Sequence, residues 1–229
     1  MRPGPRRSVT HAEILGAAFE LLETKGFDAV SVRGVAGALG LTPTAMYTYY
    51  PNKQALLAGM VEQVFGRLAI DAAPADGSDS TSATDVAGAR ARVLALAHAL
   101  RDLLVDRPGA VGLLLATPLD GPNATRVDEE LLAAFTAAGL DLVAADRATQ
   151  AVRVHVLGAV AFDAARAARV VEAAAEPEAP AASSDTLWDD LESFPLADRS
   201  RELDDDPVQR FAWSVERLLD GLLAGVPVR

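Results

Sequence analysis

The sequence contains no cysteine among its 229 residues. Without thiols the chain has no disulfides, thiolate metal ligands or cysteine nucleophiles, and a reducing compartment suits it. Long apolar runs are also missing, because Arg153 and Asp163 interrupt the best candidate before it reaches the roughly 18 residues of a membrane helix. The basic N-terminal segment lacks the unbroken apolar core of a signal peptide. We therefore expect a soluble, cytoplasmic protein with no membrane partner.

Catalytic motifs are scarce as well. The chain has three histidines, no HExxH or GxSxG motif, and no glycine-rich phosphate loop after a strand. The acidic run at 204–206 resembles a metal site only in its charge, and it more simply places carboxylates at the positive end of the last predicted helix. We therefore expect no enzymatic activity, no metal and no cofactor. A helical enzyme stays as a remote alternative.

The formal net charge of −11 is unevenly distributed. Residues 1–70 carry seven Lys and Arg against five Asp and Glu, whereas the remainder carries 14 against 27. Exposed charges separated by more than about 10 Å are largely screened at about 0.1 M salt. An acidic body therefore permits a small, slightly basic N-terminal segment to contact phosphate, although charge alone does not demonstrate such binding.

Half of the residues are hydrophobic, mainly Ala and Leu, and no alternating runs of β-branched or aromatic residues occur. This composition favours an all-α fold without a sheet. Thr10 and Glu13 form a capping box that predicts the first helix. Thr42 followed by Pro43 predicts a brief third helix, which Pro51 stops. In this segment we expect helices at about 10–25, 31–39, 43–49 and 52–70.

A polar stretch at 71–83 predicts a flexible connector between two domains. The first domain, residues 1–57, is predicted to be a three-helix helix-turn-helix head, whose fourth helix continues to about residue 70. The stretch at about 175–206 is rich in Pro, Ala, Ser and acidic residues, so we expect most of it to be a mobile linker. The second domain, 84–229, is predicted to contain helices at about 84–106, 108–116, 123–138, 142–174 and 207–224.

The head resembles the DNA-binding signature of the tetracycline-repressor (TetR) family almost position by position, through SVRGVAGALGLTPTAMYTYYPNKQALL at 31–57. Its tight turn at 39–41 has the spacing of a helix-turn-helix, whose second helix lies in the major groove of DNA. The resemblance implies contacts to the DNA backbone from the helix starts and to bases from the third helix. The implied DNA-binding residues are Ser31, Arg33, Thr42, Pro43, Thr44, Tyr47, Thr48, Tyr49 and Lys53.

Several of these side chains have an ordinary structural role open to them. Tyr47 and Tyr49 either brace the DNA backbone or cover the seam between the first and fourth helices. Arg33 and Lys53 either pair with phosphates or are solvated surface charges. Tyr50 is predicted to belong to the core of the head. The N-terminal arginines either enter an adjacent minor groove or form a free polar tail.

The second domain resembles the tetracycline-repressor-like C-terminal domain more loosely, through DRPGAVGLLLATPLDGPNATR at 106–126, HVLG at 155–158 and RFAWSVERLLDGL at 210–222. This resemblance implies a ligand cavity walled by the helices between 84 and 170. It also implies a homodimer formed by the helices at about 142–174 and 207–224. Small residues such as Gly158 and Ala161 either allow that close packing or simply reflect helix propensity.

The chain departs from the tetracycline-binding members at two positions. Leu113 stands where they have a metal-binding histidine, and Thr117 stands where they have an arginine, so a magnesium-chelated tetracycline is disfavoured. The two histidines of this domain either bind ligand or are satisfied core residues, and its phenylalanines either line a cavity or fill it. The candidate ligand-binding residues are His98, Leu113, Thr117, Phe135, His155 and Phe162.

Together these patterns predict a ligand-responsive transcriptional repressor that binds a palindromic operator in double-stranded DNA as a homodimer. A small hydrophobic effector would release it. The alternative is a DNA-binding activator or architectural protein without an effector, which a filled body would favour and a sizeable internal cavity would not. Within the acidic linker, apolar residues at helical spacing in 186–194 predict that 183–200 is either a lid over the pocket or incidental surface packing.

Overall fold

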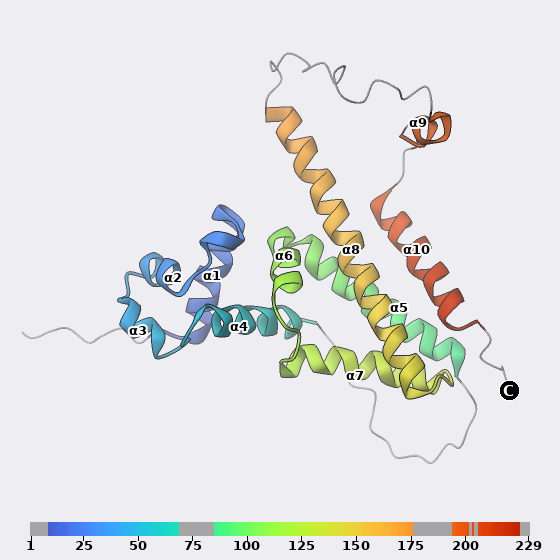
Figure 1. Ribbon diagram of the computed structural model, residues 1–229, viewed down its shortest axis with the longest axis horizontal. Helices are drawn as coiled ribbons and strands as arrows, with labels where there is room; N and C mark the ends of the chain where they lie inside the picture. The colour runs from blue at the N-terminus through green and yellow to red at the C-terminus, as the bar shows by residue number, and fades with distance from the viewer. Residues whose placement is uncertain (1–8, 69–84, 176–193, 202, 204–205, 225–229) are drawn as a thin grey trace, which may run out of the picture.

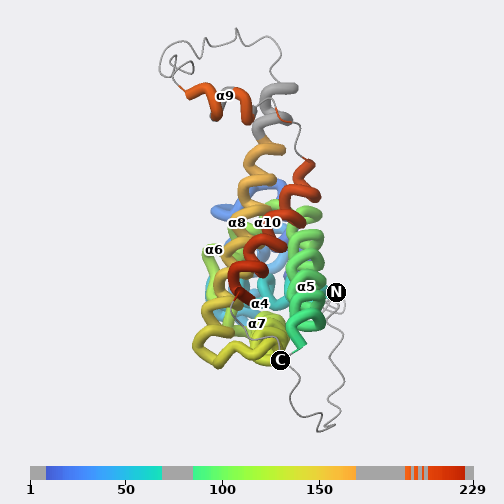
Figure 2. The backbone as a smooth tube through the Cα atoms, turned by 90° about the vertical axis from the view of Figure 1, so that its right-hand side faces the viewer, coloured from blue at the N-terminus to red at the C-terminus, as the bar shows by residue number. Residues whose placement is uncertain are grey.

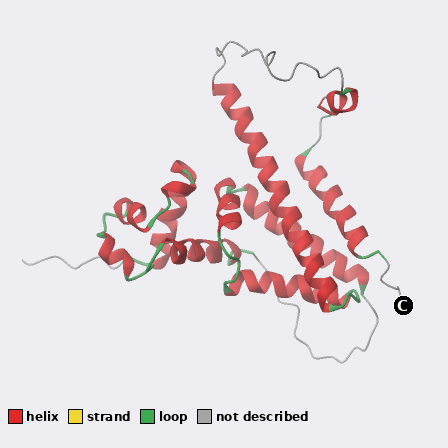
Figure 3. Cartoon of the chain, viewed as in Figure 1, coloured by secondary structure: helices red, strands yellow, loops and turns green. Residues whose placement is uncertain are grey.

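The computed structural model describes residues 9–68, 85–175, 194–201, 203 and 206–224. Within these ranges all regular secondary structure is helical and no strand is present (Figure 3). The all-α prediction is therefore confirmed. The predicted connector at 71–83, most of the acidic linker and the N-terminal arginines lie outside the described residues.

The head is a small cluster of helices around a common core (Figure 1). Its elements are α1 (His11–Lys25), the 3-10 helix η1 (Phe27–Ala29), α2 (Val32–Ala38), α3 (Pro43–Tyr47) and α4 (Lys53–Phe65). The α-helices all begin at a side chain that accepts a backbone N–H, which stabilises a helix by about 1 kcal/mol. These capping residues are Thr10, Ser31, Thr42 and Asn52. The local sequence therefore sets the start of each helix, as predicted.

Two predicted helix ends lie too far along the chain. α4 ends at Phe65 instead of about 70, because the body lies directly beyond it: a side chain at Gly66 would come within 3.0 Å of the Asn123 amide. α3 ends at Tyr47 instead of 49, because hydrogen bonds between residues three apart tighten its last turn. α3 is thus a short helix of five residues, about one and a half turns.

Tyr50 confirms its predicted place in the core of the head. Its ring is 8% exposed, and its hydroxyl lies 3.2 Å from His11 Nδ1 on α1. Gly59 on α4 leaves room for the ring, because a Cβ there would lie 2.9 Å from Tyr50 Cε1. Burial raises the pKa of Tyr50. Together with the fully buried Met46, this ring fixes the α3 segment against α1 and α4.

The body consists of α5 (Val86–Val105), α6 (Pro108–Ala116), α7 (Pro122–Ala137), α8 (Leu142–Ala175), α9 (Pro195–Arg201) and α10 (Pro207–Leu222). α8 has 34 residues and is therefore about 51 Å long. α5, α8 and α10 lie side by side in both views, and α7 crosses the lower ends of α5 and α8 (Figure 1 and Figure 2). The body helices agree with the predicted ones except for α9.

α9 lies in the stretch that we expected to be a linker, and the sequence analysis missed it. Pro195 at its first position is the start signal that could have been used. Of the predicted lid, residues 183–193 lie outside the described part of the chain. Phe194 and Leu196 are exposed by 61% and 79%, so neither packs on the domain surface. The lid therefore stays a prediction.

The head meets the body at two places. On one side α6 packs on α1, η1 and α4, and the Arg107 guanidinium lies 5.2 Å from the centroid of the Phe19 ring. A Cβ at Gly109 would lie 3.1 Å from Leu22, so the start of α6 closely approaches α1. On the other side the end of α4 packs against the start of α7. No helix in the described ranges is long and apolar enough to cross a membrane.

Candidate nucleic-acid interface and ligand-binding sites

A hollow of about 310 Å³ opens on the head where the starts of α2 and α4 meet α3. It is lined by Ser31, Val32, Arg33, Tyr47, Pro51, Asn52 and Lys53. The structure thus brings together four of the predicted DNA-binding residues that come from three different helices. The capping hydrogen bonds of Ser31 and Asn52 hold two of these helix starts at the rim, since they bond to Gly34 N at 3.0 Å and Ala55 N at 2.8 Å.

The side chains around this hollow suit an anion. Arg33 is exposed, and Lys53 is half-buried with its Nζ 4.9 Å from the centroid of the Phe27 ring. Tyr47 is 45% exposed although it is a large aromatic residue. Two cations and a phenol beside the amides at the start of α4 form the type of arrangement that holds a phosphate group. The sequence predicts Arg33, Tyr47 and Lys53 as DNA-binding residues, but only the fold shows that they share one hollow.

α3 presents the other predicted DNA-binding residues on its outer surface. Thr42, Pro43, Thr44 and Thr48 are all exposed. Two of the hydroxyls already have intramolecular partners: Thr42 Oγ1 accepts from Ala45 N at 3.2 Å, and Thr48 Oγ1 donates to Ala45 O at 2.6 Å. Both hydroxyls therefore stabilise the ends of α3, although their side chains lie on its exposed surface.

Tyr49 differs from Tyr47 in its surroundings. It is half-buried, it packs against the core of the head, and its ring lies edge-on to His11 with centroids 5.4 Å apart. For Tyr49 the packing role that the sequence left open is thus present, whereas Tyr47 points outward. Of the two tyrosines, Tyr47 is the one available to a partner.

The interior of the body holds a small apolar cavity between α5, α7 and α8. Its volume is about 20 Å³, which is room for about one water molecule. It is lined by Phe65, Leu96, Ala97, Leu100, Leu119, Ala124, Val127, Asp128, Leu131, Val152, Arg153 and Val156. The only charged side chains among them, Asp128 and Arg153, pair with each other. None of the six predicted ligand-binding residues lies in this lining.

The structure places four of those six predicted residues elsewhere in the body. Leu113 and Phe135 are fully buried core residues. Thr117 is buried, and its hydroxyl has no hydrogen-bond partner among the described residues. His98 is half-buried on α5, where its ring lies edge-on to Phe211 with centroids 5.2 Å apart. Sequence reasoning missed the residues that do line the cavity, such as Leu100, because they come from several helices.

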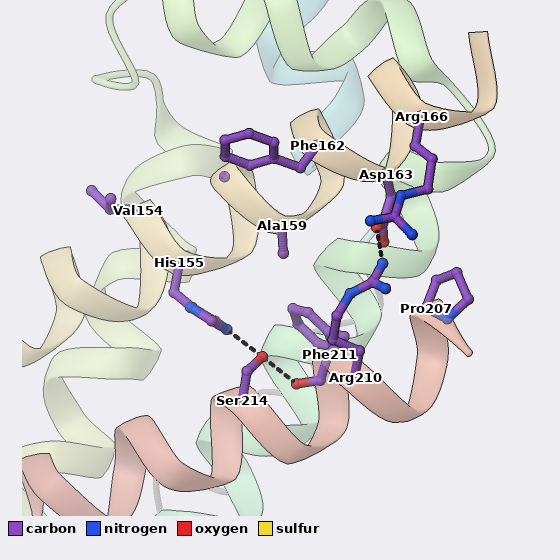
Figure 4. A pocket seen from close by; sticks show the side chains of 11 residues that line it. Val154, His155, Ala159, Phe162, Asp163, Arg166, Pro207, Arg210, Phe211 and Ser214 are labelled. Carbon is purple, nitrogen blue, oxygen red and sulfur yellow. Dashed lines mark hydrogen bonds and ion pairs between the residues drawn. The ribbon is translucent and has the colours of Figure 1, made fainter. Parts of the chain in front are cut away.

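The remaining two predicted residues, His155 and Phe162, line a larger open groove between α8 and α10 (Figure 4). The groove has a volume of about 820 Å³. His155 Nε2 lies 2.9 Å from Ser214 Oγ, which donates to Phe211 O at 2.9 Å, and the histidine ring stacks on Phe211. Burial lowers the pKa of His155. His155 therefore has the contacts of a satisfied core histidine that holds α10 on α8.

Asp163 at the same groove joins three helices. It accepts from Arg210 of α10 at 2.6 Å (Figure 4). It also lies 3.7 Å from the guanidinium of Arg101 of α5. The Arg101 side chain is 7% exposed, and its guanidinium lies 5.4 Å from the centroid of the buried Phe211 ring. These contacts join α5, α8 and α10 into one layer.

Three large apolar side chains of this layer are exposed. Val154 and Phe162 on α8 are exposed by 67% and 79%, and Trp213 on α10 is exposed by 66%. Exposed large apolar side chains that form one patch are typical of a protein–protein interface.

Two family models together match most of the chain. Residues 14–60 match the bacterial regulatory proteins of the tetR family, and residues 84–226 match the tetracyclin repressor-like C-terminal domain. The first match runs from within α1 to within α4, and the second contains the body. The two matches leave residues 61–83 between them, which include the end of α4 and the predicted connector at 71–83.

Similar proteins are found among both curated sequences and solved structures. The chain is 31% identical over 157 residues to an HTH-type transcriptional regulator of Saccharopolyspora erythraea, covering 68% of this chain and 61% of that protein. It is 26% identical over 162 residues to an HTH-type transcriptional repressor of Mycobacterium tuberculosis, covering 69% and 59%. The chain thus spans about three fifths of the length of these relatives.

The crystal structure of ActR from Streptomyces coelicolor in complex with (S)-DNPA superposes with a TM-score of 0.70 at 20% identity, covering 96% of this chain and 100% of that one. This likeness extends the shared fold over head and body together. The matching families and relatives are regulators rather than enzymes, in agreement with the expectation from the sequence. The chain belongs to the TetR family of bacterial regulatory proteins.

Proposed function

We propose that this protein is a transcriptional repressor that binds a palindromic operator as a homodimer and is released by a small-molecule effector. The observation that carries the proposal is the hollow on the head, where Arg33, Tyr47 and Lys53 converge beside the exposed face of α3. A phosphate seated in that hollow would position the head, and α3 would lie in the adjacent major groove. The Mycobacterium tuberculosis relative is a transcriptional repressor, which supports repression rather than activation.

In this proposal the outer residues of α3 meet the bases. Pro43 and Thr44 are short and exposed, so the helix start can approach base edges closely. Ser31, Arg33 and Lys53 contact the DNA backbone, and Tyr47 braces it from the hollow. The half-buried Tyr49 contributes by fixing α3 to α1 rather than by touching DNA.

The homodimer is proposed to form through the apolar outer face of α8 and α10. Homodimers are typical of this family, and Val154, Phe162 and Trp213 would be covered by the same residues of a second copy. A two-fold axis between two heads requires half-sites whose centres are about 34–36 Å apart, or a multiple of that distance. The operator is therefore expected to be a palindrome.

The effector is proposed to enter the cavity between α5, α7 and α8. Ligand binding is typical of the family, and ActR was crystallised with (S)-DNPA, which supports a small-molecule effector. The lining is apolar apart from the paired Asp128 and Arg153, so a largely hydrophobic effector fits it. Since the cavity holds only about 20 Å³ here, the effector must widen it. The effector then binds the widened state of the protein more tightly than the narrow state, and this difference in affinity shifts the equilibrium between them.

The same small cavity is the observation that favours the second candidate, a DNA-binding activator or architectural protein without an effector. Selection of duplexes from a random pool, repeated with hydrophobic compounds added, tests both candidates. A selected palindrome that a compound releases supports the repressor. A palindrome that no compound releases, with no compound bound in calorimetry, favours the second candidate, and absence of any selected sequence refutes both.

A further inference from the structure

α7 begins without a capping side chain of its own. Its N-cap residue is Gly121, and Pro122 at the first position has no N–H to satisfy. The next two amides are instead bonded by the Glu62 carboxylate of α4, which accepts from Asn123 N at 2.7 Å and from Ala124 N at 3.2 Å. These are the two amides that an N-cap side chain normally satisfies. Glu62 is therefore the cap of a helix that belongs to the other domain.

The contact is reciprocal, and Glu62 fills the space beside the start of α7. The Asn123 side chain donates from Nδ2 to Glu62 O at 3.1 Å, next to the end of α4. Gly66 lies against that same amide, since a Cβ there would come within 3.0 Å of it. A Cβ at Gly121 would overlap the Glu62 carboxylate, so Glu62 occupies the space of the missing cap. We call this contact between Glu62 and residues 121–124 the latch.

The latch lies directly beside the interior cavity. Ala124, whose amide bonds Glu62, is one of the cavity-lining residues, and Phe65, the last residue of α4, is another. Widening of the cavity on the side of Ala124 and Phe65 therefore moves the first turn of α7, the end of α4, or both. Two amide–carboxylate bonds at the positive end of a helix are directional, and they tolerate such a shift less well than apolar packing does.

The second contact between head and body is of a different kind. At α6, the Arg107 guanidinium lies over the Phe19 ring, and Gly109 approaches the apolar side chain of Leu22. Stacking and apolar contacts of this sort permit sliding without loss of a specific bond. The latch is thus the part of the junction that has discrete made and broken states.

We propose that Glu62 couples the ligand cavity to the orientation of the DNA-binding head, by capping α7 from α4 in one state and releasing it in the other. The proposal rests on the function proposed above, but the geometry that it predicts can be measured without DNA or effector. With the latch made, the head has one orientation relative to the body. With the latch broken, it pivots on the α6 contact and samples many orientations.

Two substitutions break the latch in opposite ways. Glu62→Ala removes the carboxylate and leaves α7 uncapped. Gly121→Ser gives α7 a cap of its own and displaces the flexible end of Glu62; the residue has φ −79° and ψ 166°, which serine adopts readily at an N-cap. The second variant therefore releases the head without weakening α7. Glu129→Ala, at an exposed position on the same helix, is the matched control.

The head orientation is read out by spin labels in the full-length chain. Because the sequence has no cysteine, single cysteines placed at the exposed positions Ala38 on α2 and Ala133 on α7 take the labels specifically. Doubly labelled chains are diluted with unlabelled chains, so that only distances within one chain contribute. We expect a single narrow distance distribution for the parent and for Glu129→Ala, and a broad or shifted one for both latch variants.

A second readout uses a duplex selected with the parent protein. Both latch variants should bind it roughly tenfold more weakly. In the parent the latch fixes the head before DNA binds, whereas in the variants DNA binding must also offset the entropic cost of fixing the head. Gly121→Ser should do so while its thermal midpoint matches that of the parent. Narrow distributions and parental affinity in Gly121→Ser and Glu62→Ala would overturn the latch. If no duplex is selected, the proposed function fails, and the distance measurement alone decides the latch.

Discussion

The hollow on the head predicts a definite change in how DNA binding depends on salt. Each phosphate that a protein cation neutralises contributes about −0.9 to the slope of log K against log[salt]. Lys53 lines the hollow once per head, so a homodimer carries two copies of it. Replacement of this residue in Lys53→Gln should therefore reduce the slope by about 1.8.

This slope corresponds to a measurable change in affinity. Between about 50 and 200 mM salt, a slope difference of about 1.8 changes the ratio of parental to variant affinity by roughly 12-fold. The variant also loses the contact between Lys53 Nζ and the Phe27 ring, 4.9 Å away. That contact is worth about 1 kcal/mol or less at an exposed site, and its loss lowers stability without changing the salt slope.

Fluorescence anisotropy on a selected duplex at four or five salt concentrations gives the slope directly. Arg126→Ala is the control, because this exposed cation lies on α7 of the body. Its slope should equal that of the parent. An unchanged slope in Lys53→Gln, or an equal reduction in Arg126→Ala, would show that the hollow does not seat a phosphate.

Three further substitutions test other parts of the structure. Met46→Ala should lower the free energy of unfolding by about 2–5 kcal/mol in thermal or denaturant melts, because it leaves a cavity beneath α3; a smaller loss would contradict its core role. Burial lowers the pKa of His155, so as pH falls below 6.5 the unfolded chain takes up the proton first and stability falls. In His155→Gln the loss of thermal midpoint between pH 7.5 and 5.5 should be smaller than in the parent, and an equal loss would contradict the assignment. Phe162→Asp, at a residue 79% exposed, should give monomers in sedimentation velocity if α8 forms the dimer, and an intact dimer would exclude this face.

The helices of this chain were largely predictable because their signals are local. Thr10, Ser31, Thr42 and Asn52 each cap the helix that follows, and a cap needs only three or four neighbouring residues to form. Where a helix end depends on a distant residue, prediction was wrong: α4 stops at Phe65, where the body begins.

The sites also differ in whether their residues are close together in the sequence. The predicted DNA-binding residues belong to one short run, so a family resemblance could name them. Only the fold separates the exposed Tyr47 from the half-buried Tyr49. The cavity residues come from α4, α5, α7, α8 and a loop, and no spacing in the sequence joins them. The α7 cap was equally out of reach, because Glu62 and Ala124 are 62 positions apart.

Selection of bound duplexes from a random pool tests the central claim most directly. The account predicts that the full-length protein enriches a palindrome whose half-sites are centred about one or two helical turns apart, as two heads on a dimer require. Tyr47→Ala, at a residue 45% exposed, should fold normally and lose that enrichment. Enrichment of no sequence at low ionic strength, or undiminished enrichment by Tyr47→Ala, would contradict the account.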